Sequence, residues 1–195
     1  MTNDIISPSD TSRRDFLKKI GLATATAGLI TQPAFSALAM PQSRVKMGGE
    51  CRDVCLYNAN TRESINTVFY AHGEYNKQSF NQLCHFLRDC RENQAHWMDP
   101  RVLTLLYDMQ TIFDRRQIHV ISGYRTARTN AMLSRTTRGV AKDSFHMRGQ
   151  AIDIRIPGIE TSAVRDVAKI LGVGGVGYYP ASHFVHVDTG PVRTW

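Results

Sequence analysis

The 195-residue sequence has no apolar run long enough to cross a membrane, no internal repeat and no low-complexity segment. The weakly apolar run Ile20–Ile30 has 11 residues, whereas a membrane-spanning helix needs about 20. A recognisable nucleic-acid-reading motif is also missing, so the excess of 24 Lys and Arg over 17 Asp and Glu does not indicate a nucleic-acid partner. These absences leave a globular protein whose mature chain does not span a membrane.

The first 39 residues contain the three parts of an export signal. The pair Arg13-Arg14 precedes the apolar run Ile20–Ile30, and the small-residue site Ala37-Leu38-Ala39 follows it. The paired arginines indicate export by the twin-arginine machinery, so we expect residues 1–39 to be removed and the mature protein to be periplasmic. Their removal takes away four basic and three acidic residues, leaving 20 and 14, a net charge of +6. That charge suits an anionic partner such as cell-wall polymer or lipid headgroups.

Cysteine is scarce, with four residues at Cys51, Cys55, Cys84 and Cys90. In an exported chain this even number predicts disulfides or buried free thiols, with a pairing that the sequence does not define. The alternative is a second metal site, but the spacings Cys-x3-Cys and Cys-x5-Cys are not those of common zinc knuckles.

After a flexible leader at residues 40–50, we expect residues 51–195 to form one α+β domain with a central antiparallel sheet flanked by helices. This length allows one ordinary domain, and 42% hydrophobic residues are enough for a core. Apolar runs and alternation predict strands at 54–57, 65–70, 117–122, 150–156, 176–179 and 184–188. Helical spacing predicts helices at 77–91, from Asp99-Pro100 onward, at 129–135 and at 161–171.

Two short stretches contain residues able to hold a metal. The first, Ser144 to Asp153, includes His146, and the second, His183 to Asp188, includes His186. If the two strands pair, strand alternation brings Asp153 and His186 to one point with His146. Two imidazoles and a carboxylate are a set that holds catalytic zinc and leaves a position for water. Ordinary histidines and an ion-paired aspartate would give the same spacing.

Longer motifs resemble a known family. The run from Ser144 to Asp153, Ser-Phe-His-Met-Arg-Gly-Gln-Ala-Ile-Asp, is similar to the S-x-H-x-x-G-x-A-x-D signature of zinc peptidases that cut D-amino-acid bonds in bacterial walls. The chain most resembles the YcbK-like murein endopeptidases, with similar motifs in the same order. These are the twin-arginine signal, Ile121–Arg125, Arg138–Lys142, the His/Asp signature, Gly174–Pro180 and Phe184–Pro191.

This resemblance implies a hedgehog-like or D,D-peptidase-like fold and zinc held by His146, Asp153 and His186. It also implies that Arg125 contacts substrate and stabilises a developing oxyanion, which suits a permanently charged, planar guanidinium. The alternative for Arg125 is a surface charge. The implied function is hydrolysis of D,D (4-3) or L,D (3-3) peptide cross-links between meso-diaminopimelate stems during wall growth. The alternatives are a carboxypeptidase that trims stem peptides and a wall-binding domain without turnover.

The general base differs from that of better-known relatives of this family. Many of them have an acidic residue three positions before the last zinc histidine or a His two positions before it, where this chain has His183 and Phe184. With an ordinary pKa of about 6.5, His183 is able to accept a proton. The alternative is an exposed loop histidine.

Three further residues have expected roles around the metal ligands. Asp188 lies on the same strand face as His186 and is expected to accept a ring N–H. Ser144 either orients substrate or fixes the loop of His146, and we favour the loop. Tyr178 is a candidate for wall contact, with core packing as the alternative.

Overall fold

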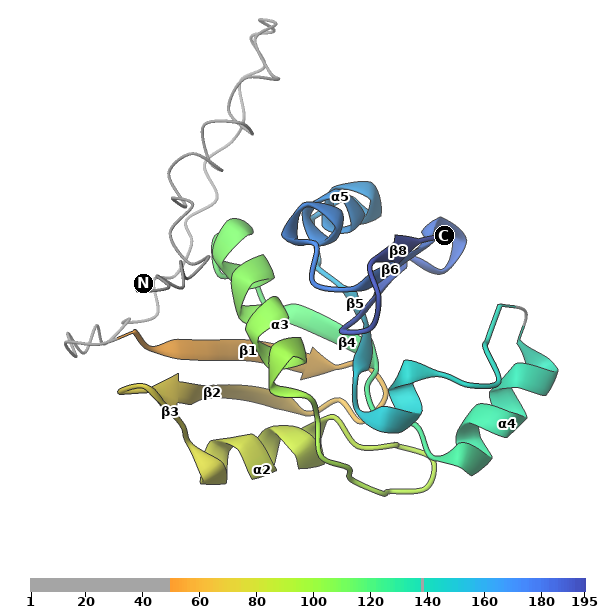
Figure 1. Ribbon diagram of the computed structural model, residues 1–195, viewed down its shortest axis with the longest axis horizontal. Helices are drawn as coiled ribbons and strands as arrows, with labels where there is room; N and C mark the ends of the chain where they lie inside the picture. The colour runs from red at the N-terminus through yellow and green to blue at the C-terminus, as the bar shows by residue number, and fades with distance from the viewer. Residues whose placement is uncertain (1–49, 138) are drawn as a thin grey trace, which may run out of the picture. The chain divides into compact units, whose positions relative to one another are not determined.

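The structure is a computed structural model that describes residues 50–137 and 139–195 (Figure 1). The predicted signal peptide at 1–39 lies outside the described residues, as does the leader apart from Glu50. Among the helices of the described part, none is long and apolar enough to cross a membrane.

Within the described residues, eight strands form one sheet in the order β3-β2-β1-β4-β5-β7-β6-β8. The strands are β1 (Arg52–Asn58), β2 (Ser64–Ala71), β3 (Glu74–Tyr75), β4 (Ile118–Ser122), β5 (Ala151–Arg155), β6 (Gly175–Tyr179), β7 (Phe184–Asp188) and β8 (Arg193–Thr194).

The prediction of an α+β domain is confirmed, but the sheet is mixed where an antiparallel sheet was predicted. Strands β1 and β4 pair in parallel, as do β6 and β8. The chain between β1 and β4 passes through β2, β3 and two helices before it returns in the direction of β1. With only two residues each, β3 and β8 are too short to show a periodic pattern in the sequence.

The helices in the described part are α2 (Lys77–Phe86), α3 (Pro100–Ile112), α4 (Ala127–Thr136) and α5 (Thr161–Leu171), with short 3-10 turns η1 (Phe145–Arg148) and η2 (Pro180–Ser182). Residues of α2, α3 and α5 form the core with the sheet, as shown by the buried side chains of Phe80, Leu106 and Val167. In Figure 1, α4 stands apart from these three helices.

Specific side chains set the helix boundaries. Helix α3 begins as predicted, because the Asp99 carboxylate accepts the N–H of Arg101 at 2.9 Å and Pro100 occupies the first turn. Helix α2 ends before the predicted Arg91. A continuing helix would bond the Arg91 N–H to the Leu87 carbonyl, but Asp89 Oδ1 accepts that N–H at 2.9 Å and Tyr124 N–H donates to Leu87 O at 2.8 Å.

The hydrophobic core and the predicted metal ligands lie on opposite faces of the sheet. In β5, Ile152 and Ile154 are fully buried in the core cluster, and in β7 Val187 belongs to the same cluster. Because side chains alternate along a strand, Asp153 and His186 point to the opposite face. The site is therefore built on the sheet face that α2, α3 and α5 leave free.

Candidate metal centre

Strand register brings two of the predicted ligands together. Asp153 and His186 lie directly opposite each other in the antiparallel pair β5–β7, as the alternation predicted. His146 approaches from η1, where the Ser144 hydroxyl accepts the His146 backbone N–H at 3.4 Å. Gly149 then turns the chain into β5 with a φ of 65°, a conformation that costs glycine little. The contact made by Ser144 is the one expected of a residue that fixes the His146 loop.

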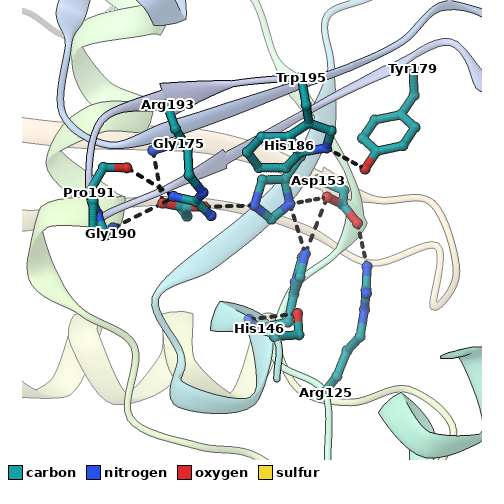
Figure 2. Close-up of polar contacts among 12 residues, drawn as sticks. Arg125, His146, Asp153, Gly175, Tyr179, His186, Gly190, Pro191, Arg193 and Trp195 are labelled. Atoms are coloured by element: carbon teal, nitrogen blue, oxygen red, sulfur yellow. Dashed lines mark hydrogen bonds and ion pairs between the residues drawn. The ribbon is translucent and has the colours of Figure 1, made fainter. Parts of the chain in front are cut away.

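Three ligand atoms from these side chains converge (Figure 2). His146 Nε2 lies 3.2 Å from Asp153 Oδ1 and 3.1 Å from His186 Nδ1, and the latter two atoms are 2.9 Å apart. Zinc with tetrahedral ligands at about 2.0 Å requires ligand separations of about 3.3 Å. In the part of the chain that the structure describes, these residues are the one group of three or more His, Cys, Asp and Glu placed to hold a metal ion.

Hydrogen bonds to the outer ring nitrogens orient both imidazoles. His146 Nδ1 lies 2.7 Å from the Gly123 carbonyl oxygen, which accepts only, so this nitrogen carries the proton. His186 Nε2 donates in the same way to Asp188 Oδ2 at 3.0 Å. His146 Nε2 and His186 Nδ1 are therefore left with lone pairs that face Asp153 Oδ1. Three electron-pair donors so close to one another repel unless a cation lies among them, so the geometry fits a metal ion.

The charges around the site favour a cation as well. Burial alone raises the pKa of Asp153, but the attraction and hydrogen bonds of His146 and His186 in their protonated forms outweigh it and hold the pKa well below its usual range. Burial lowers the pKa of His186, yet its bonds to Asp153 and Asp188 give a net rise. For His146, burial dominates and the pKa is lowered. Two carboxylates thus stabilise positive charge where the ring nitrogens meet.

Arg125 places a second positive charge beside the ligands. Its guanidinium bonds to Asp153 Oδ2, and its Nε donates to Ser122 Oγ at 2.7 Å. The Arg125 side chain is 12% exposed, so it borders the cavity while remaining fixed. A fixed guanidinium in this position is suited to binding an anionic oxygen.

Asp188 is anchored more firmly than the sequence indicated. Its Oδ1 accepts the N–H groups of Gly175 and Gly190, each at 2.9 Å. The Arg193 guanidinium donates to both carboxylate oxygens, at 3.1 and 2.7 Å. Burial raises the pKa of Asp188, but these contacts and the bond to His186 outweigh it and lower the pKa. Asp188 lies within hydrogen-bond distance of His186, the position in which the sequence predicts it, whereas the sequence does not predict the contact with Arg193.

A cavity of about 420 Å³ opens over the ligands. Arg125, His146, Asp153 and His186 are among its lining residues, with Arg193 beside them. The remaining lining residues form two groups. The first lies after α4, at Thr137, Gly139, Val140, Ala141, Asp143, Ser144 and Phe145. The second lies on the last strands and η2, at Tyr179, Ser182, Phe184 and Trp195.

Three candidate residues do not line this cavity: Asp188, which contacts His186 from behind, and His183 and Tyr178. His183 is exposed, has a φ of 52° at the end of η2, and donates its backbone N–H to Pro180 O at 3.2 Å. Tyr178 packs against the core, with the Arg165 guanidinium 4.5 Å from its ring centroid. The structure therefore favours the alternatives for His183 and Tyr178, a loop histidine and a core tyrosine. Trp195 lines the cavity but was missed, because an Arg-x-Trp run after Pro191 has no periodic pattern.

The four cysteines are free, so the structure contains no disulfide between them. Cys84 is buried and its Sγ accepts the Met98 N–H at 3.4 Å, and burial raises the pKa of this thiol. Cys51 and Cys90 are exposed. The prediction of buried thiols thus holds for Cys84 alone.

Comparison with known proteins identifies the family of this chain. Residues 46–195 match the Peptidase_M15_2 family model, which is described as peptidoglycan L,D-endopeptidase MepK. The chain is 42% identical over 187 residues to peptidoglycan L,D-endopeptidase MepK of Escherichia coli K12, covering 95% of this chain and 98% of that protein. It is 39% identical over 188 residues to the probable MepK of Haemophilus influenzae, covering 95% and 96%. The chain therefore belongs to the M15 peptidase family of peptidoglycan L,D-endopeptidases.

Proposed function

We propose that this protein is an exported, zinc-dependent murein endopeptidase that hydrolyses the L,D (3-3) cross-links between diaminopimelate residues of neighbouring stem peptides. The observation that carries the proposal is the convergence of His146 Nε2, Asp153 Oδ1 and His186 Nδ1 at the floor of a cavity. The names of its relatives favour the L,D bond over the D,D (4-3) bond. The twin-arginine signal supports action in the periplasm, and the proposed fold type is that of hedgehog-like and D,D-peptidase domains.

In this proposal, His146, Asp153 and His186 hold the zinc. When bound, zinc supplies Lewis acidity to a carbonyl oxygen and makes hydroxide available near neutral pH. The Gly123 carbonyl and Asp188 keep the two imidazoles in the tautomers that leave their inner nitrogens free. Arg193 holds Asp188 in place and keeps it ionised.

Arg125 is the residue proposed to stabilise the charge that develops on the scissile carbonyl oxygen. Its guanidinium is fixed by Asp153 and Ser122 before substrate arrives, so little reorganisation is needed during the reaction.

Two carboxylates line the cavity, Asp143 and Asp153. Asp153 belongs to the ligand set, and Asp143 is 75% exposed and pairs with Arg148 at 2.7 Å.

The test is to incubate the mature protein, loaded with zinc, with two purified muropeptide dimers, one cross-linked 3-3 and one cross-linked 4-3. Products are followed by mass, with and without a chelator. We expect the 3-3 dimer to fall to monomers, the 4-3 dimer to react more slowly, and the chelator to stop both reactions.

Three other outcomes would each favour a different activity. Faster loss of the 4-3 dimer would reassign the preferred bond. Release of terminal D-alanine alone, without monomers, would indicate a carboxypeptidase. Binding of either dimer without cleavage, by protein that contains one zinc per chain, would indicate a wall-binding domain and overturn the proposal.

A further inference from the structure

An aromatic surface forms one side of the cavity, next to His186. Tyr179 and Phe184 stack with ring centroids 4.5 Å apart, and the indole of Trp195 lies 5.3 Å from the His186 ring. Trp195 remains 51% exposed although it is one of the largest apolar side chains of the molecule. Figure 2 shows the indole beside His186, with its ring nitrogen directed to Tyr179.

The backbone is shaped to admit this indole. Gly177 pairs with His186 across β6 and β7, and a Cβ atom on Gly177 would lie 2.8 Å from carbon atoms of the indole. Any other residue at position 177 would displace the indole, because a Cβ atom does not approach another carbon atom as closely as 2.8 Å in proteins. Backbone bonds also hold Trp195, because its N–H donates to Val176 O at 3.2 Å and its carbonyl accepts the Tyr178 N–H at 3.0 Å. The indole position is therefore built in by three neighbouring strands.

A hydrogen bond then sets the direction of the Tyr179 hydroxyl. Trp195 Nε1 donates to Tyr179 Oη at 2.9 Å. An indole N–H is a donor only, whereas a phenol both donates and accepts. Because the hydroxyl oxygen accepts from the indole, its own hydrogen is free to be donated to another acceptor.

We propose that Trp195, with Phe184 and Tyr179, is the subsite that binds the aliphatic side chain of the cross-linking diamino acid, and that Tyr179 donates a hydrogen bond to a carbonyl or carboxylate on it. This inference rests on the proposed function, because it assigns part of the same cavity to one part of the substrate. A chain of methylene groups between polar centres needs an apolar surface ending in a polar donor. The aromatic surface has both features within one hydrogen-bonded pair.

The first experiment measures steady-state cleavage of the 3-3 dimer by the zinc-loaded mature protein and its variants. We expect Trp195→Ala to raise KM about tenfold with a smaller change in kcat and unchanged zinc content. Tyr179→Phe and Trp195→Phe should each lower kcat/KM about fivefold. The double variant Tyr179→Phe/Trp195→Phe should have the same kcat/KM as Tyr179→Phe alone, because the indole N–H acts through the tyrosine hydroxyl.

Trp97→Phe is the matched control, because Trp97 is 58% exposed, stacks on Phe80 and does not line the cavity. Its kinetics should equal those of the unmodified protein. Gly177→Ala changes a different strand and should reproduce the rise in KM seen for Trp195→Ala.

A binding measurement separates contact from a purely structural effect. Titration of the holoenzyme with the monomeric tetrapeptide product should change tryptophan fluorescence in the unmodified protein and in Trp97→Phe, but not in Trp195→Phe. If the unmodified protein cleaves the dimer and Trp195→Ala retains its KM, the subsite is overturned while the proposed function stands. If the unmodified, zinc-loaded protein cleaves neither dimer, the proposed function fails first.

Discussion

The two sides of the cavity are built by different means. On the strand side, β5, β7, β6 and β8 place Asp153, His186 and Trp195 by backbone register. On the loop side, residues 139–144 are held by individual side chains. The clearest is Asn130 of α4, whose Nδ2 donates to the carbonyls of Ala141 and Lys142 at 3.0 and 2.9 Å.

Because the two sides are built differently, we expect them to serve different functions. A ladder of backbone hydrogen bonds fixes Asp153 and His186 with little dependence on any one neighbour, which suits a metal site whose ligand distances tolerate only small changes. A loop held by a few side-chain hydrogen bonds has fewer constraints than a strand, which suits a segment that contacts substrate. We therefore expect changes to the strand ligands Asp153 and His186 to affect zinc content and rate. Changes to the loop should affect substrate binding, as expected for Trp195, which contacts no metal.

The largest effect is expected from Asp153→Asn. The amide removes the charge that attracts the metal and leaves Arg125 without its ionic partner. Zinc content should fall well below one per chain, and kcat/KM should fall by roughly a thousandfold, as loss of several kcal/mol of metal assistance requires. Asp166→Asn is the control, because Asp166 pairs with Arg165 at the surface of α5. Full zinc content with full activity would show that Asp153 is not a ligand.

The next largest effect is expected from Arg125→Met, which should lower the reaction rate without lowering the zinc content. We expect kcat to fall about a hundredfold, while zinc measured by mass spectrometry or a chelator assay stays near one per chain. Arg128→Met is the matched control, since this arginine of α4 is 84% exposed and does not line the cavity. An unchanged kcat for Arg125→Met would show that Arg125 does not stabilise charge on the substrate.

The strand side was also the more predictable of the two. Alternation along β5 and β7 was enough to place Asp153 and His186 on one face, because a period of two admits only two faces. By contrast, the Gly123 carbonyl that orients His146 and the Asn130 amide that holds the loop depend on contacts between distant segments. No local pattern encodes such contacts. The parallel pairing of β1 with β4 was missed for the same reason.

On the loop side, Asn130→Asp tests the two hydrogen bonds from Asn130 to the loop, because the side chain keeps almost the same size. A carboxylate cannot donate to the carbonyls of Ala141 and Lys142, and it would repel them. We expect kcat/KM for the dimer to fall about tenfold, mainly through KM, with zinc content unchanged. Asn58→Asp is the matched control, because Asn58 is also buried and its Nδ2 donates to Phe86 O at 3.1 Å outside the cavity. Loss of zinc from Asn130→Asp would contradict the division between the two sides.

The smallest effect is expected at His183, the residue that the sequence offered as a general base. Its left-handed backbone makes alanine a poor replacement, so His183→Asn is the better variant, because asparagine tolerates this conformation and cannot act as a base near neutral pH. Since His183 is exposed and does not line the cavity, kcat/KM should change by less than about twofold between pH 6 and 8. A loss of tenfold or more, with zinc and thermal stability retained, would mean that His183 reaches the substrate during turnover and that the strand side moves. An unchanged rate would confine the proton transfer to groups that line the cavity.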